Sequence, residues 1–194
     1  VHGSRGLGDV YKRQIFNKSL HQRIASGLPI SIPVAGDLVG RVDEKGQLDV
    51  DSCVTVDDRT LPRISRNCQL GRLVTTGPLP GSEIYTSSGE TGEIELGAIK
   101  EYGLDQIDWQ VEQIPRLSSK GTRRALVTSY QELFVDVVPI ALDESMGEKW
   151  QQGPTENSRW HPEGACLRFR FTLSSGSYAT TLLREFMQCP LNQL

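Results

Sequence analysis

Five cationic side chains stand where they could contact phosphate groups. Lys120, Arg123 and Arg124 lie in a glycine-containing loop, and a flexible loop can present cations to phosphates. Arg168 and Arg170 share one face of an alternating segment. Alternatives stay open for both groups. Arg123 or Arg124 could pair with an acidic neighbour, and the face with Arg168 and Arg170 could be covered by another part of the protein.

A second group lies at the start of a predicted C-terminal helix. It consists of Ser177, Tyr178, Ala179, Thr180 and Arg184. The first N–H groups of a helix lack intrahelical partners and suit a phosphate or the polar edge of a base. In the structural alternative, Ser177 is only a cap, Tyr178 belongs to the core, and Arg184 pairs with Glu185 on the helix surface.

General catalytic signatures are missing from the sequence. It contains no GxSxG, HExxH, Walker-type lysine loop or GxGxxG motif. The four cysteines form no CxxC pair, so neither a zinc site nor a redox pair is predicted, and we expect reduced thiols in apolar surroundings. These cysteines are Cys53, Cys68, Cys166 and Cys189.

Charge and composition exclude other broad classes. The 194 residues include 21 Lys and Arg against 24 Asp and Glu, a net charge of −3. No global positive field would therefore draw this chain to nucleic acid, and any such contact must come from a local patch. No apolar run approaches the length of about eighteen residues that a membrane span needs, and we expect a cytoplasmic protein.

The clearest predicted element is a strand from Leu167 to Leu173, in which apolar and polar residues alternate without exception. A helix that includes Leu182 to Met187 should pack back on its apolar face. Near the other end, Asp43 to Gly46 separates two short apolar runs and predicts a hairpin. Thr91 can cap a helix with Glu95 in its first turn, where the helix dipole favours anions.

These elements predict an α+β fold with a mixed or antiparallel sheet and packed helices. Residues 1–14 show no helical or strand period, so we interpret them as foreign adapter sequence. A helix should then begin abruptly at Ile15, without a cap, as in an N-terminally truncated protein. A change in composition near residue 126 predicts two domains, 15–126 and 127–194.

Four segments, in order along the chain, resemble signatures of the tRNA pseudouridine synthase D (TruD) family. They are Ile15-Phe-Asn-Lys-Ser-Leu-His-Gln-Arg23, Thr76-Gly-Pro-Leu-Pro-Gly81, Leu117-Ser-Ser-Lys-Gly-Thr-Arg-Arg124, and Ser174-Ser-Gly-Ser-Tyr-Ala-Thr-Thr-Leu-Leu-Arg-Glu-Phe-Met187. Together the segments extend over residues 15 to 187. Each alone is weak, but four ordered matches are hard to produce by chance.

The resemblance implies an enzyme that isomerises uridine to pseudouridine in RNA, most naturally tRNA, without cofactor or metal. It assigns residues 15–126 to the family's insertion domain and 127–194 to part of its catalytic domain. On this basis Ser177 to Thr180 and Arg184 would line the catalytic pocket. Lys120, Arg123, Arg124, Arg168 and Arg170 would contact the RNA.

The family's catalytic Asp has no match here, because Asp37, Asp43 and Asp105 lie outside its motif. We therefore expect a fragment that is inactive alone and prone to self-association through an open sheet edge. The alternative is a non-catalytic RNA-binding or interaction module.

Overall fold

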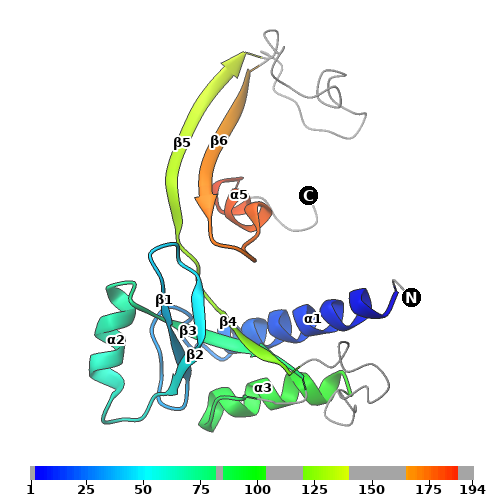
Figure 1. Cartoon of the computed structure of the whole chain (residues 1–194), viewed down its shortest axis with the longest axis vertical. Coiled ribbons are helices and arrows are strands. Elements are labelled where there is room, and N and C mark those ends of the chain that lie inside the picture. The colour runs from blue at the N-terminus through cyan, green and yellow to red at the C-terminus, as the bar shows by residue number, and fades with distance from the viewer. Residues whose placement is uncertain (1–2, 82–84, 104–119, 140–164, 188–194) are drawn as a thin grey trace. The chain divides into compact units, whose positions relative to one another are not determined.

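The computed structural model describes residues 3–81, 85–103, 120–139 and 165–187. The chain forms two compact units, Val1–Thr128 and Ser129–Leu194, each considered by itself (Figure 1). The division falls close to residue 126, where the composition changes. Both units combine helices with antiparallel strands, which confirms the predicted α+β class. Among the described helices, none has both the length and the apolar character to cross a bilayer.

The first unit is built on a four-stranded sheet with the order β2-β1-β3-β4. Its strands are β1 (Leu38–Val42), β2 (Leu48–Thr55), β3 (Leu73–Leu79) and β4 (Thr122–Ala125). The predicted hairpin between β1 and β2 is confirmed. Gly46 has φ of 73° in its turn, and Asp43 accepts hydrogen bonds from the backbone N–H groups of Lys45 and Gln47. A side chain on residue 46 would strain this turn.

Three helices pack around this sheet and form two small cores. They are α1 (Gly3–Ala25), α2 (Leu61–Gln69) and α3 (Gly89–Glu101). Ile15 of α1 packs with Ala98 and Ile99 of α3. Ile64 of α2 packs with Val39 and Val56. Figure 1 shows α2 apart from α1 and α3, with strands between them.

Two predicted helix starts are wrong. The first helix begins at Gly3 rather than at Ile15. Ile15 and Phe16 are buried, and once packing has formed one turn, adding residues to a helix costs little. The helix α3 begins after Ser88 rather than at Thr91. Thr91 thus lies inside the helix, and Glu95 lies one turn deeper than predicted.

The second unit is a long hairpin with one helix. Strands β5 (Tyr130–Pro139) and β6 (Ala165–Leu173) pair in antiparallel register, and α5 (Ala179–Met187) follows them. The ring of Phe169 lies 5.3 Å from that of Phe186 on α5. The helix therefore packs on the apolar face of β6, as the alternating pattern predicts.

The close packing of α3 gives a stability prediction. A methyl group on Gly92 would stand 2.3 Å from the Ser87 carbonyl oxygen, which is backbone and cannot rotate away. Gly92→Ala should lower the free energy of unfolding by about 1 to 3 kcal/mol, the usual cost of overpacking. A methyl group on Gly97 of the same helix would meet no neighbouring element within 4 Å, so Gly97→Ala should stabilise by up to about 1 kcal/mol. Urea unfolding followed by circular dichroism measures both, and equal effects would contradict this packing.

Candidate functional site

Arg123 is buried at the centre of a hydrogen-bond network in the first unit. The residue is 3% exposed. Its Nη1 and Nη2 donate to the two carboxylate oxygens of Glu95 at 2.8 and 2.9 Å, a bidentate ion pair. Its Nε donates to Thr76 Oγ1 at 3.0 Å, and Nη2 donates to the Thr76 carbonyl at 2.7 Å. Further bonds run from Nη1 to the Tyr85 carbonyl and from Nη2 to Ser87 Oγ.

This arrangement satisfies every donor of the Arg123 guanidinium, and Glu95 is satisfied as well. The Glu95 carboxylate also accepts hydrogen bonds from the backbone N–H and the hydroxyl of Ser87. A guanidinium enclosed in this way has no donor left for a phosphate. Arg123 therefore does not face RNA in this structure. It pairs with an acidic neighbour, the alternative that the sequence left open.

Three of the family-like segments meet beside this network. Gly77 of β3 lies against α1, and a Cβ there would stand 3.0 Å from Phe16 and 2.9 Å from Leu126. The guanidinium of Arg124 lies over the Phe16 ring at 5.0 Å. The Phe-Asn helix, the Thr-Gly-Pro-Leu turn and the Gly-Thr-Arg-Arg loop are thus parts of one packed junction. Residues 117–119 of the last segment lie outside the described residues.

A second buried ion pair fastens the end of α1. Arg23 donates from Nη1 and Nη2 to the two carboxylate oxygens of Asp37, each at 2.7 Å. Its Nε donates to the Pro29 carbonyl, and Asp37 also accepts from the backbone N–H of Val34. Asp37 is 1% exposed, so its carboxylate is enclosed and committed to this pair.

Of the other loop cations, Lys120 is exposed and Arg124 is half-buried. In the second unit, Arg168 and Arg170 lie on one exposed face of β6, as predicted. Both contact Asp136 of β5, at 3.5 and 3.0 Å, and Arg170 also lies over the Phe134 ring. These exposed pairs leave part of each guanidinium open to solvent, because the two side chains remain more than half exposed.

The turn before α5 differs from the structural alternative, in which Ser177 caps the helix and Tyr178 belongs to the core. Tyr178 precedes the helix, and its carbonyl accepts hydrogen bonds from the N–H groups of Thr181 and Leu182. Ser177 instead bonds to the Ser174 hydroxyl at 2.9 Å. Tyr178 is 45% exposed, so it is not a core residue in this chain. Ala179 and Thr180 are exposed as well.

Arg184, on the next turn of α5, is partly buried. Its Nε–H is shielded from solvent and has no hydrogen-bond partner among the described residues. A buried N–H of this kind costs free energy unless a polar group meets it. This atom is therefore a candidate donor to a ligand or to another polypeptide segment.

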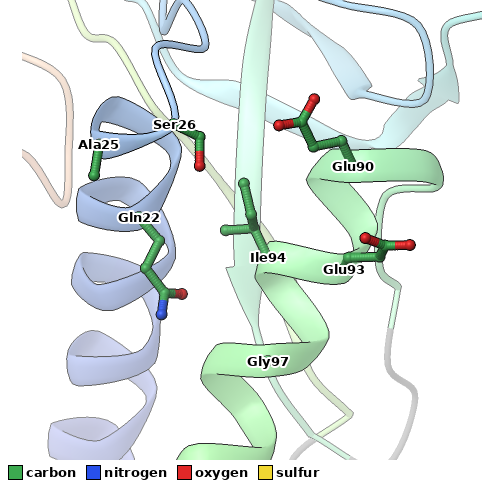
Figure 2. A pocket seen from close by; sticks show the side chains of 7 residues that line it. All are labelled: Gln22, Ala25, Ser26, Glu90, Glu93, Ile94 and Gly97. Carbon is green, nitrogen blue, oxygen red and sulfur yellow. The ribbon is translucent and has the colours of Figure 1, made fainter.

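A groove in the described part of the first unit lies between α1 and α3. It has a volume of about 530 Å³ and is lined mainly by Gln22, Ser26, Glu90, Glu93 and Ile94. Figure 2 shows Gln22 on α1 and Ser26 just after its end, across from Glu90 and Ile94 on α3. The two carboxylates would repel phosphates, so this groove does not suit an RNA backbone.

The described side chains include neither an activated thiol nor a cluster of metal ligands. Burial raises the pKa of the Cys53 thiol, and burial together with the Asp37 charge raises the pKa of Cys68. Both thiols are thus poor nucleophiles near neutral pH. In the described ranges, no three His, Cys, Asp or Glu side chains come together as a metal site. The side chains of Cys166 and Cys189 lie outside the described part.

The family model described as tRNA pseudouridine synthase D (TruD) matches residues 9–186. The chain belongs to this family. The TruD match includes the junction around Arg123 and Thr76, the β5–β6 hairpin and nearly all of α5. The four segments that resemble family signatures all fall within it, apart from Met187.

This TruD chain has several relatives that share one name. It is 36% identical over 188 residues to the "Probable tRNA pseudouridine synthase D" of Methanosarcina mazei, covering 97% of this chain and 37% of that protein. A protein of the same name from Natronomonas pharaonis is 30% identical over 174 residues, covering 90% and 33%. A crystal structure of a TruD protein from Methanosarcina mazei matches with a TM-score of 0.69 at 33% identity, covering 93% and 37%. The chain spans about a third of the length of these relatives.

Sequence reasoning missed Glu95 and Thr76 as the partners of Arg123. The sequence predicts for Glu95 only an interaction with the helix dipole, and for Thr76 only a place in a turn. One signal could have indicated these partners. Two of the TruD-like segments lie on β3 and β4, and these two strands pair with each other. Pairing of Pro78 with Arg123 brings the buried arginine beside Thr76.

The buried pair gives a prediction for this TruD chain. Arg123→Met should lower the free energy of unfolding by about 3 to 5 kcal/mol, because it leaves the Glu95 carboxylate buried without a partner. The double variant Arg123→Met with Glu95→Leu should recover part of this loss, because neither charge is then buried. Urea unfolding measures both. Exposed Lys120→Ala is the control, with a change within about 0.5 kcal/mol, and an Arg123→Met effect of the same size would refute the role of the pair.

Proposed function

We propose that this chain is part of a tRNA pseudouridine synthase, which isomerises uridine to pseudouridine. The observation that carries the proposal is the family match, which extends over both units. In this reaction the bond between the sugar and the base nitrogen N1 breaks, the base rotates, and a bond between the sugar and carbon C5 forms. The C5 hydrogen leaves as a proton, and the released N1 takes up a proton. The target base must leave its stack to be reached. No cofactor or metal is proposed.

The proposed division of labour follows the two units. Residues 15–126 would form the insertion domain and residues 127–194 part of the catalytic domain. The relatives are much longer than this chain. The nucleophilic Asp is therefore proposed to lie in a part of the family protein that corresponds to the relatives' uncovered length. Enclosure of Asp37 by Arg23 supports this assignment. The setting is proposed to be the cytoplasm, where tRNA is modified.

Separate groups would bind the RNA and line the pocket. Lys120, Arg124, Arg168 and Arg170 are proposed to contact phosphates, while Arg123 holds the loop that carries the first two. Phosphate contacts position an RNA without reading its sequence. Ser177 to Thr180 would line the pocket, and exposure of Tyr178 supports its contact with a base or another segment. The unpartnered Nε–H of Arg184 would donate to a polar group there.

The function is tested with a hybrid protein. The matching segment of the Methanosarcina mazei relative is replaced by this chain, and release of C5 hydrogen from labelled uridine in bulk tRNA is measured. We expect activity from the hybrid and none from this chain alone. Inactivity of both, with RNA binding retained, would favour the non-catalytic RNA-binding module.

The same hybrid tests the pocket. Tyr178→Ala should lower turnover by about tenfold or more at unchanged melting temperature. Without the Tyr178 side chain the base would be held less accurately, and misplacement of reacting groups slows a reaction strongly. Tyr130→Ala is the matched control, since Tyr130 is exposed to the same degree. If both variants turn over normally, the pocket assignment of Tyr178 is wrong.

The exposed apolar face of the hairpin supports a proposal of self-association. Val137 and Leu167 are cross-strand partners and are 70% and 59% exposed. Exposed apolar patches of this kind commonly mark interfaces. Sedimentation velocity should show concentration-dependent association of the chain, weakened by the double variant Val137→Thr with Leu167→Thr. Ile24→Gln with Leu96→Gln, on exposed positions of α1 and α3, should leave association unchanged, and a monodisperse parent chain would disprove the proposal.

A further inference from the structure

The helix α2 carries a row of arginines that no part of the proposed function uses. Arg63 and Arg66 lie three residues apart within the helix, so they share one helical face, and Arg59 lies in the turn just before the helix. All three are exposed. The opposite face, with Leu61, Ile64 and Cys68, packs on Val39 and Val56. The arginine row therefore points away from the protein core.

The arginines of this row form no ion pair among the described residues. Residues 59 to 72 contain no Asp or Glu, and the nearest acidic residues in sequence are Asp57 and Asp58, directly before Arg59. Within the described part of the chain, no ion pair involves the side chains of Arg59, Arg63, Arg66 or Arg72. Like charges at these spacings weaken a helix, and a cation near its N-terminus opposes the dipole. The arrangement therefore costs stability.

The helix is fixed at both ends, so it can hold the row in place. At its start, Thr60 donates from its backbone N–H and its hydroxyl to the Asp57 carboxylate, at 2.6 and 2.8 Å. At its end, the N–H of Arg72 donates to the Asn67 carbonyl and that of Gly71 to the Cys68 carbonyl. This pattern is a Schellman motif, which also holds Arg72 beside the last turn.

The type of residue on this face points to a phosphate backbone rather than to bases. Residues 53 to 72 contain no aromatic side chain on which a base could stack. Arginine binds phosphate oxygens through paired N–H donors. Since the net charge of the chain is −3, this row is a local basic patch on an acidic protein. The face of α1 and α3 with Glu90 and Glu93 carries the opposite charge.

We propose that the exposed face of α2, with Arg59, Arg63, Arg66 and the adjacent Arg72, binds the sugar–phosphate backbone of the RNA substrate. This inference rests on the proposed function, and it adds a second RNA contact that is separate from Lys120 and Arg124. The contact is independent of base sequence. It adds affinity and orients the RNA, and it weakens as salt rises.

The test measures binding of bulk tRNA to the 194-residue chain by fluorescence anisotropy at several salt concentrations. Each lost phosphate contact reduces the slope of log affinity against log salt by about 0.7 to 0.9. The variant R63Q/R66Q should thus lower the slope by about 1.4 to 1.8. R63K/R66K should keep the parental slope. The control K45Q/K100Q removes the same charge from exposed positions elsewhere and should leave the slope unchanged.

The possible outcomes bear differently on the α2 contact and on the proposed function. Binding by the parent chain with an unchanged slope in R63Q/R66Q would overturn the α2 contact and leave the proposed function intact. Failure of the parent chain to bind tRNA would overturn both the RNA contact and the proposed role of this chain in RNA binding. A third arm compares two competitors of equal charge, a glutamate oligomer and an RNA oligomer. If the glutamate oligomer displaced the tRNA as effectively as the RNA oligomer, the patch would bind an acidic protein partner and the RNA assignment would be wrong.

Discussion

The bidentate pair between Arg123 and Glu95 is the constraint on which the first unit depends. It joins β4 to α3, and through Thr76 it joins both to β3. Because both charges are enclosed, either one alone would be strongly unfavourable, so the three elements can occupy their places only together. The packed contacts of Phe16, Gly77 and Leu126 add α1 to the same junction. Three family segments that look unrelated in sequence thus form one structural unit.

Exposed and buried arginines have different roles in this protein. Arg23 and Arg123 are enclosed and bind carboxylates. The row on α2 is exposed and has no carboxylate within its own segment. Net charge alone conceals this difference, because the acidic groove between α1 and α3 offsets the basic face of α2. An acidic protein can therefore still carry a local basic face, while the groove between α1 and α3 carries the opposite charge.

Local patterns predicted much of the fold. The alternation from Leu167 to Leu173 and the turn at Gly46 were sufficient to place β6 and the first hairpin, because period and turn chemistry are local properties. The sequence does not predict the features that depend on tertiary contacts, such as which side chains of a polar loop are buried. It could not show that Arg123 is buried while Lys120 is exposed, since both lie in one polar loop. The start of α1 was also misplaced, because helix extension into residues 3–14 depends on packing at Ile15 rather than on a local cap signal.

The late position of β4 in the chain affects how the first unit is made. Its partner β3 and the carboxylate of Glu95 are synthesised well before Arg123 leaves the ribosome. Until then, burial of Glu95 is unfavourable, because no cation compensates its charge. The helix α3 therefore cannot dock stably during synthesis of the preceding residues, and final closure of the unit awaits a contact between distant parts of the sequence. The last strand of the first unit is thus also the strand that completes its core.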